Sequence, residues 1–321
     1  MKREGKMTTA VARKTGPGAG TKRFRKNLAL LLMCIPAILF FLVFNYIPMP
    51  GIYVAFINFN YKAGIFGSPF VGLENFRFLL MTGDLPVLIR NTVLYNLAFI
   101  LVGNIVQIAM ALMLNEIGNR RFRKVSQSLM ILPHFISYVI VGLFAYNLLN
   151  FEFGVLNTAL RNMGLAPLKI YSNAGAWPFI IVLTNLWKGA GYGTIIYFAA
   201  IMNIDVQMLE AAEIDGANIF QRMRYIMLPS LKPTFVILLL FSLGGILQGN
   251  FGLMYNMVGA RNQALFATTD IIETYVFRAM MSNFNFATAS TVGFVQSVFG
   301  FLLVLGANTL VRKLEPEYSL F

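Results

Sequence analysis

Long apolar runs alternate with short polar segments along the whole chain. Six runs reach the length of roughly 20 residues that a helix needs to cross a bilayer. None of the thirteen acidic residues falls within them. The pattern therefore predicts an all-α integral membrane protein with six transmembrane helices, over residues 28–48, 92–115, 125–149, 177–202, 233–254 and 288–311.

Composition supports a membrane protein and narrows the chemistry. The 321 residues are 57% hydrophobic and only 12% charged, about half the charged fraction of a soluble domain. The one cysteine, Cys34, lies inside an apolar run. It has no partner in the chain for a disulfide, and no metal site can rest on thiols alone.

The net charge of +13 reflects membrane topology rather than nucleic-acid binding. Eighteen of the 26 Lys and Arg residues lie before the first run, between the second and third, between the fourth and fifth, or after the last. Seven lie on the other side. Because basic loops stay in the cytoplasm, both termini are expected there: a membrane-proximal basic tail over residues 1–27, which is not a cleaved signal, and a short C-terminus over 315–321.

The polar segment over residues 205–229 stands between two apolar runs and contains "EAAEIDGANIFQRMRYIMLP". Asp205 is predicted to cap a short helix that ends at Gly216. Asn218 and Gln221 form a capping-box pattern for a second helix, which Leu228-Pro229 is expected to stop. Ile219, Met223 and Met227 share one face of that helix. The segment is either a rigid cytoplasmic knob or an amphipathic loop on the bilayer surface.

The spacing of the motif decides between these two interpretations. It resembles the EAA signature of permease subunits of binding-protein-dependent ABC importers, in the version found in sugar importers. The resemblance runs from about Ala29 to Leu314 and includes "SPFVGLENFRFLL" and "MILPHFIS". "TTDIIETYVFRAMMSNFNFATASTVG" is similar to the LplB/YteP-like complex-carbohydrate subgroup. The resemblance implies a type I importer permease fold over residues 28–314. It implies ATPase-coupling residues at Glu210, Ala211, Ala212, Asp215, Gly216, Ile226, Leu228 and Pro229.

The same resemblance implies partners in a bacterial plasma membrane. These are a second, homologous permease that forms a heterodimer with this chain, a cytoplasmic ATPase dimer and an extracellular sugar-binding lipoprotein. The chain has no Walker A pattern, G-x-x-x-x-G-K-[ST]. It is therefore expected to be a non-catalytic transport subunit without a cofactor of its own, and ATP and Mg²⁺ would belong to the ATPase.

Polar residues inside the predicted spans are candidates for the substrate pathway. In the fourth span they recur at i, i+3, i+4 and i+7, which is one helical face. These four match the sugar site of the maltose permease, as do three residues of other spans. Ile246 stands where that site has an asparagine, and Gln248 or Asn250 could replace it. The seven candidates are His134, Tyr138, Asn185, Lys188, Gly189, Tyr192 and Ser242. Taken singly, each also has a structural interpretation, such as a helix-backbone hydroxyl for Ser242.

Lys188 is the one cation within a predicted span. An unpaired ammonium at that depth costs about 2.5–3.5 kcal/mol on insertion scales. It could snorkel to the interface, pair with the partner permease, or face the pore. Our hypothesis is that it faces the pore and favours acidic oligosaccharides such as pectin fragments.

Three alternatives remain open. The chain could serve an ABC importer for another class of solute. An ion-coupled secondary transporter would be expected to hold acidic residues within its spans. A membrane-embedded enzyme would need more catalytic groups than one histidine and one cysteine.

Overall fold

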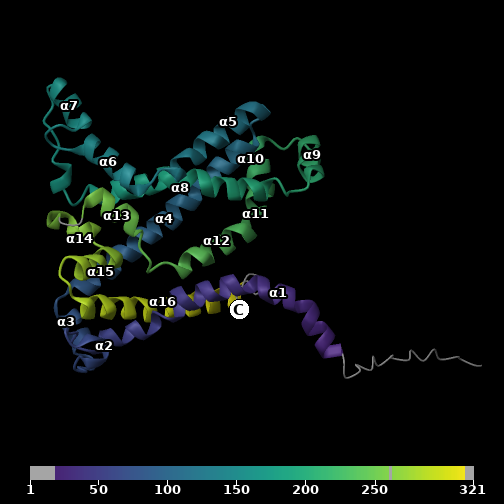
Figure 1. Cartoon of the computed structure of the whole chain (residues 1–321). Coiled ribbons are helices and arrows are strands. Elements are labelled where there is room, and N and C mark those ends of the chain that lie inside the picture. The colour runs from purple at the N-terminus through teal and green to yellow at the C-terminus, as the bar shows by residue number, and fades with distance from the viewer. Residues whose placement is uncertain (1–18, 260–261, 315–321) are drawn as a thin grey trace, which may run out of the picture. The chain divides into compact units, whose positions relative to one another are not determined.

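The computed structural model describes residues 19–259 and 262–314, and these are mostly helical (Figure 1). Within the described residues no strand is assigned, and a single antiparallel bridge pairs Ile57 with Phe70. The chain divides into two compact units, Met1–Ile52 and Tyr53–Phe321. Most of the predicted basic tail and all of the C-terminal segment 315–321 lie outside the described residues.

The first unit consists mainly of helix α1, Ala19–Phe41, and the π-helical turn Leu42–Tyr46. The helix begins earlier than the apolar run, which starts at residue 28. Residues Leu32–Phe56 are long and apolar enough to cross a membrane, and every side chain from residue 32 to 50 is exposed. Such a surface suits lipid as its solvent.

The second unit begins with a short segment that precedes its first long helix. The rings of Phe56 and Phe76 in this segment meet that of Phe294 in α16 (Phe286–Leu314) at centroid distances of 5.3–5.6 Å. The long helix α4 starts at Asp84, earlier than the predicted residue 92, directly after Gly83 at φ +73°. The elements are α2 (Gly64–Gly67), α3 (Glu74–Met81) and α4 (Asp84–Asn115).

The predicted third span is broken in its middle. Helix α5, Arg120–Ile131, gives way to a 3₁₀ turn, Leu132–Phe135, and then to α6, Tyr138–Leu149. The axes of the two halves differ by 90°. The sequence explains the break, because Pro133 cannot donate a backbone hydrogen bond and Ser137 caps α6 through its hydroxyl.

Helix α8, Trp177–Ile201, coincides with the predicted fourth span, is long and apolar enough to cross a membrane, and packs against α4 and α5. Its "GAGYG" cluster lies at these contacts. A Cβ atom on Gly191 would overlap the carbonyl of Met130 in α5, and one on Gly193 would overlap the side chain of Gln107 in α4. Small residues let helix backbones approach closely where lipid supplies no hydrophobic driving force. Between α6 and α8 lie α7 (Val155–Asn162) and the 3₁₀ turn Ile170–Ser172.

The polar segment folds as two short helices, as predicted, but the second does not stop at Leu228-Pro229. A π-helical turn, Met223–Met227, follows α10 and leads through α11 into α12. The axis bends by 53° between Ser230 and Lys232. Because proline is tolerated in a first helical turn, Pro229 and Pro233 bend the chain without ending it. The bounds are α9 (Val206–Ile214), α10 (Ile219–Arg222), α11 (Leu228–Ser230) and α12 (Lys232–Gly244).

The predicted fifth span, residues 233–254, is not one helix. Helix α12 ends at Gly244, and α13, Phe251–Val258, begins after a non-helical stretch. Side chains from three other helices bind the freed backbone. Asn96 donates to the carbonyls of Ile246 and Gln248, Gln296 donates to the carbonyl of Leu247, and the Glu273 carboxylate accepts from the N–H of Gly249. The remaining elements are the 3₁₀ turn Gln263–Leu265, α14 (Phe266–Thr269), α15 (Ile272–Met281) and α16 (Phe286–Leu314).

Among the described residues, four helices are long and apolar enough to cross a membrane, and six are when each bent pair counts as one span. The upper number equals the six predicted spans. Within the second unit, the polar segment lies at one end and α7 and α14 lie at the other (Figure 1). The architecture is therefore an all-α bundle whose two ends carry different chemistry.

The glycine contacts generate a stability prediction. Gly191→Ala should destabilise the detergent-solubilised protein by about 1–3 kcal/mol, because overpacking forces the α5 and α8 backbones apart. Gly189→Ala is the matched control, since no atom lies within 4 Å of the added Cβ. Thermal unfolding followed by tryptophan fluorescence should show a lower midpoint for Gly191→Ala only. Equal midpoints would contradict the close approach.

Candidate functional site

The candidate site has two parts, which we call the coupling segment and the inner chamber. The coupling segment comprises residues 205–229. The inner chamber is a cavity of about 370 Å³ between α4, α8 and α12. The coupling segment leads through the π-helical turn and α11 into α12, and α12 lines the inner chamber.

The caps of the coupling segment are confirmed in detail. Asp205 accepts from the N–H of Gln207 at 2.9 Å. At the other end of α9, Ala217 N–H donates to the Ala212 carbonyl and Gly216 N–H to that of Glu213, which is a Schellman motif. Gly216 takes φ +82° there, a conformation that favours glycine. The reciprocal bonds of Asn218 and Gln221, at 2.7 and 2.9 Å, complete the predicted capping box.

The surface of the coupling segment is available to a partner. Glu210, Ala211 and Asp215 are exposed, and Ala212 is half-buried. Several large apolar side chains of the segment are exposed as well, above all Ile214 at 87% and Phe220 at 80%. At the C-terminal end, Leu228 and Pro229 are exposed and Ile226 is half-buried. Exposed apolar side chains with a polar rim are typical of a protein interaction surface.

Arg222 joins the two helices of the coupling segment to each other and to the end of α4. Its guanidinium lies 2.8 Å from the carboxylate of Glu213 in α9 and 3.7 Å from that of Glu116, which follows α4. Beneath it, Met227 and Leu231 are buried against Ala111 and other residues of α4 and α8. Of the predicted apolar face, Met227 is thus buried and Met223 packs at its edge, whereas Ile219 is exposed. The segment is therefore anchored as a rigid extension of the bundle.

The inner chamber brings together three of the seven predicted pathway residues. Gly189 and Tyr192 come from α8, and Ser242 comes from α12. The Ser242 hydroxyl also donates to the Leu238 carbonyl of its own helix. His134 stacks on Tyr192 with ring centroids 4.8 Å apart and an interplanar angle of 13°.

Three amides of α4 line the inner chamber and were missed from the sequence: Asn96, Asn104 and Gln107. The signal was present, because their spacing of i, i+8 and i+11 places them on one face of a helix. Asn104 accepts from the Tyr197 hydroxyl and donates to the Ile100 carbonyl, so part of its hydrogen-bonding capacity is structural. Gln107 faces Gly193, whose missing side chain makes room for it.

Lys188 and Tyr138 lie at the break in the third span rather than in the chamber lining. The Lys188 ammonium donates to the carbonyls of His134 at 2.6 Å and Pro133 at 3.4 Å, and it sits 4.8 Å from the centroid of the Tyr138 ring. The residue is 8% exposed. Lys188 therefore donates hydrogen bonds to backbone carbonyls of the turn and helps to hold His134 against the ring of Tyr192.

The last predicted pathway residue, Asn185, and the two substitutes considered for Ile246, Gln248 and Asn250, lie in three different places. The Asn250 amide donates to the Tyr138 hydroxyl at 2.7 Å and its oxygen caps α13, so Asn250 joins the Tyr138 group. Asn185 lines a cavity of about 30 Å³ between α4 and α8, which shares Phe99, Gln107 and Gly189 with the inner chamber. Gln248 lines a third cavity, between α12 and α16. The structure thus gathers His134, Gly189, Tyr192 and Ser242, and places Asn185 in an adjoining cavity.

The chemistry of the inner chamber suits a hydroxyl-rich ligand. Its lining offers amides, hydroxyls and aromatic faces, and none of the lining residues carries a charge. Such groups orient a ligand by hydrogen bonds and ring contact. Within the described residues, no group of three or more His, Cys, Asp or Glu side chains could hold a metal ion.

Comparison with known proteins agrees with the fold and the motif. Residues 100–319 match the family of binding-protein-dependent transport system inner membrane components. Protein LplB of Bacillus subtilis (strain 168) is 32% identical over 293 residues, which cover 91% of each chain. The polygalacturonan/rhamnogalacturonan transport system permease protein YteP of the same organism is 34% identical, covering 90% of this chain and 89% of YteP.

Solved structures show the same architecture. A chain of a bacterial ABC transporter involved in the import of the acidic polysaccharide alginate matches with a TM-score of 0.82 and 32% identity. The match covers 92% of this chain and 99% of that chain. A second structure holds the alginate transporter in complex with a periplasmic protein that has bound an alginate pentasaccharide, and it matches with a TM-score of 0.80 and 31% identity. The match covers 91% of this chain and 97% of that chain.

These matches identify the class of protein: an all-helical membrane permease with the type I importer fold. The chain belongs to the family of binding-protein-dependent transport system inner membrane components. The family resemblance drawn from the EAA motif is confirmed.

Arg222 provides a test of how the coupling segment is held. Arg222→Met should raise hydrogen exchange of residues 205–229 by about tenfold, which corresponds to a loss of about 1.4 kcal/mol of local stability. Arg224→Met is the matched control, since Arg224 is exposed and sits 5.9 Å from the Tyr225 ring. Mass spectrometry of both variants compares the exchange. Unchanged protection in Arg222→Met would show that the ion pairs do not hold the segment.

Proposed function

We propose that this chain is a permease subunit of an ATP-driven ABC importer that moves oligosaccharides into the cytoplasm. The observation that carries the proposal is the coupling segment, an exposed motif anchored by Arg222 and continuous with a chamber-lining helix. The names of YteP and of the alginate transporter, which concern oligosaccharides and polysaccharides, support this substrate class.

The proposal includes partners. A second permease completes the pathway, a cytoplasmic ATPase dimer docks on the coupling segment, and an external binding protein delivers the substrate. The alginate transporter in complex with its periplasmic protein supports the last of these. This chain performs no catalysis itself, and ATP and Mg²⁺ act in the ATPase. Its termini and coupling segment face the cytoplasm, which the distribution of Lys and Arg supports.

The mechanism follows from the helical path. Closure of the ATPase dimer moves α9 and α10, and the ion pairs of Arg222 make the two helices move as one body. The π-helical turn and α11 carry the movement into α12, where Ser242 lines the inner chamber. The two breaks at residues 132–137 and 245–250 are the points at which the bundle can rearrange, because the backbone there depends on side-chain partners. The chamber thereby opens alternately to the two sides.

We further propose that the substrate is an acidic oligosaccharide of the pectin type. Lys188 places one fixed positive charge beneath His134 and Tyr138, next to the Tyr192 wall of the chamber. Its ammonium binds carbonyls and a ring face, and the ion pairs of the described residues do not include it. An uncompensated charge in a low-dielectric site raises the local concentration of the opposite charge. Charged uronates would be attracted to this part of the pathway.

An added side chain at the motif tests the coupling. Ala212→Trp should prevent ATPase docking, so that ATPase activity stimulated by loaded binding protein falls by more than about tenfold, as for loss of an interface hot spot. Ala159→Trp adds the same bulk to the exposed face of α7, away from the coupling segment, and should leave the activity unchanged. The complex is purified through this chain in detergent. An Ala212→Trp complex with full stimulation would contradict the docking site.

Lys188 tests the class of substrate. Lys188→Met should reduce uptake of galacturonate oligosaccharides more than uptake of neutral oligosaccharides of equal length, by about threefold to tenfold in the ratio. Lys188→Arg keeps the charge and should keep the ratio. Lys188→Met also removes the hydrogen bonds to the two backbone carbonyls. Because that loss lowers the uptake of both substrates alike, it cancels in the ratio of the two uptakes. Equal losses for the two substrates would assign Lys188 a purely structural role.

A further inference from the structure

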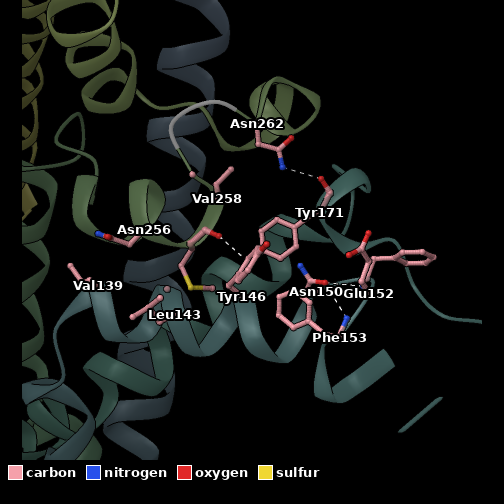
Figure 2. A pocket seen from close by; sticks show the side chains of 14 residues that line it. Val139, Leu143, Tyr146, Asn150, Glu152, Phe153, Tyr171, Asn256, Val258 and Asn262 are labelled. Carbon is pink, nitrogen blue, oxygen red and sulfur yellow. Dashed lines mark hydrogen bonds between the residues drawn. The ribbon is translucent and has the colours of Figure 1, made fainter. Parts of the chain in front are cut away.

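Another cavity of the second unit is larger than the inner chamber. It has a volume of about 700 Å³ and lies between α6, α13 and the chain that follows α6 (Figure 2). We call it the outer pocket, because it lies at the end of the unit opposite the coupling segment (Figure 1). None of its lining residues also lines the inner chamber. A volume in the range of about 300–1,000 Å³ is typical of small-molecule sites.

Aromatic rings form one wall of the outer pocket. Tyr146 meets Tyr171 at 5.8 Å and Phe153 at 5.7 Å, in both cases edge to face. Tyr146 is 46% exposed, so one side of its ring is open to the cavity. Edge-to-face packing holds the rings in place while leaving a face free. An open aromatic face in a concave site is suited to the C–H face of a sugar ring.

Polar groups with unused hydrogen-bonding capacity stand next to these rings. The Asn150 oxygen accepts from the N–H groups of Glu152 and Phe153, which leaves its amide nitrogen as a donor. The Glu152 carboxylate has no hydrogen bond or ion pair among the described residues. Figure 2 shows both side chains beside Tyr146 and Tyr171. A donor and an acceptor beside aromatic rings match the hydroxyls of a sugar.

The outer pocket is held in shape without a ligand. Arg161 donates to the carbonyls of Phe151 at 2.5 Å and Glu152 at 2.6 Å, and Asn157 donates to that of Asn150 at 3.0 Å. The Tyr171 hydroxyl donates to the Met257 carbonyl at 3.3 Å. Burial raises the pKa of Tyr171 to about 12, so the hydroxyl remains a donor at neutral pH. A site formed in advance loses little entropy on binding.

Close backbone packing forms the floor of the outer pocket. A Cβ atom on Gly142 in α6 would overlap the Asn256 carbonyl of α13, and one on Gly252 would lie 2.8 Å from the Tyr138 ring. Tyr138 also accepts a hydrogen bond from Asn250 and lies over Lys188. Helices α6 and α13 therefore form the floor of the outer pocket and also meet at Tyr138, whose ring contacts Lys188 beside the inner chamber.

We propose that the outer pocket is a second oligosaccharide subsite, which holds one sugar unit of a long substrate while another part of the same chain occupies the inner chamber. This inference rests on the proposed function. Selection there acts through the open aromatic ring and through hydrogen bonds to sugar hydroxyls, with the Asn150 amide as donor and the Glu152 carboxylate as acceptor. Only substrates long enough to reach both cavities gain from the subsite.

The test compares substrates of different length in the complete complex. Tyr146→Ala removes the open ring, and Glu152→Ala removes an exposed acceptor without disturbing the turn, whose bonds use the backbone of Glu152. Phe144→Ala is the matched control, since Phe144 is 68% exposed on the same helix and does not line the cavity. ATPase stimulation by binding protein loaded with galacturonate di- or hexasaccharide is measured for each.

We expect Tyr146→Ala to lower the hexasaccharide response by about tenfold and Glu152→Ala to lower it severalfold, with the disaccharide response and the Phe144→Ala complex unchanged. Equal losses for both lengths would overturn the subsite and point to a docking surface for the binding protein or to a structural role. A full hexasaccharide response in both pocket variants would also overturn it, while leaving the proposed function intact. A wild-type complex that responds to neither sugar would instead refute the pectin-type substrate of the proposed function, and the subsite with it.

Discussion

A backbone group that leaves a helix within the apolar core of a membrane has no water to bind, so another part of the protein must supply its partner. This constraint acts at two places in the bundle. At residues 132–137 the ammonium of Lys188 binds the carbonyls of Pro133 and His134. At residues 245–250 the partners are Asn96, Gln296 and Glu273, from α4, α16 and α15. Much of the intramembrane polarity of the chain is explained by these two breaks.

The same residues connect structure to transport. Lys188 supports the turn that carries His134, and His134 stacks on the Tyr192 wall of the inner chamber. Asn96 binds the second break and also lines the chamber. A change in either break would therefore alter the chamber. Polar residues near the inner chamber therefore cannot be divided into those that support the backbone and those that line the cavity.

The carboxylate of Glu273 enters the bundle although its residue lies outside the predicted spans. The predicted spans contain no Asp or Glu, yet Glu273, from outside them, reaches the backbone of the fifth. One of its oxygens is bound by Gly249 and Gln296, and the other is buried without a hydrogen-bond partner among the described residues. The missing side chain of Gly249 leaves the space that the carboxylate fills. A count of acids along the spans cannot detect a side chain that arrives from a neighbouring helix.

The local pattern was sufficient for the helical class, the caps at Asp205, Gly216 and Asn218, and the family motif, because these depend on near neighbours in the chain and on the apolar length needed to cross a bilayer. The breaks at Pro133 and after Gly244 were hidden within long apolar runs, since hydropathy records composition and not the direction of the axis. Gly189, Tyr192 and Ser242 line the inner chamber together with three amides of α4 only because α4, α8 and α12 pack around the same cavity. Contacts between residues far apart in the chain, such as Lys188 with His134 or Arg222 with Glu116, exist only after the helices have packed, and tertiary structure alone decided them.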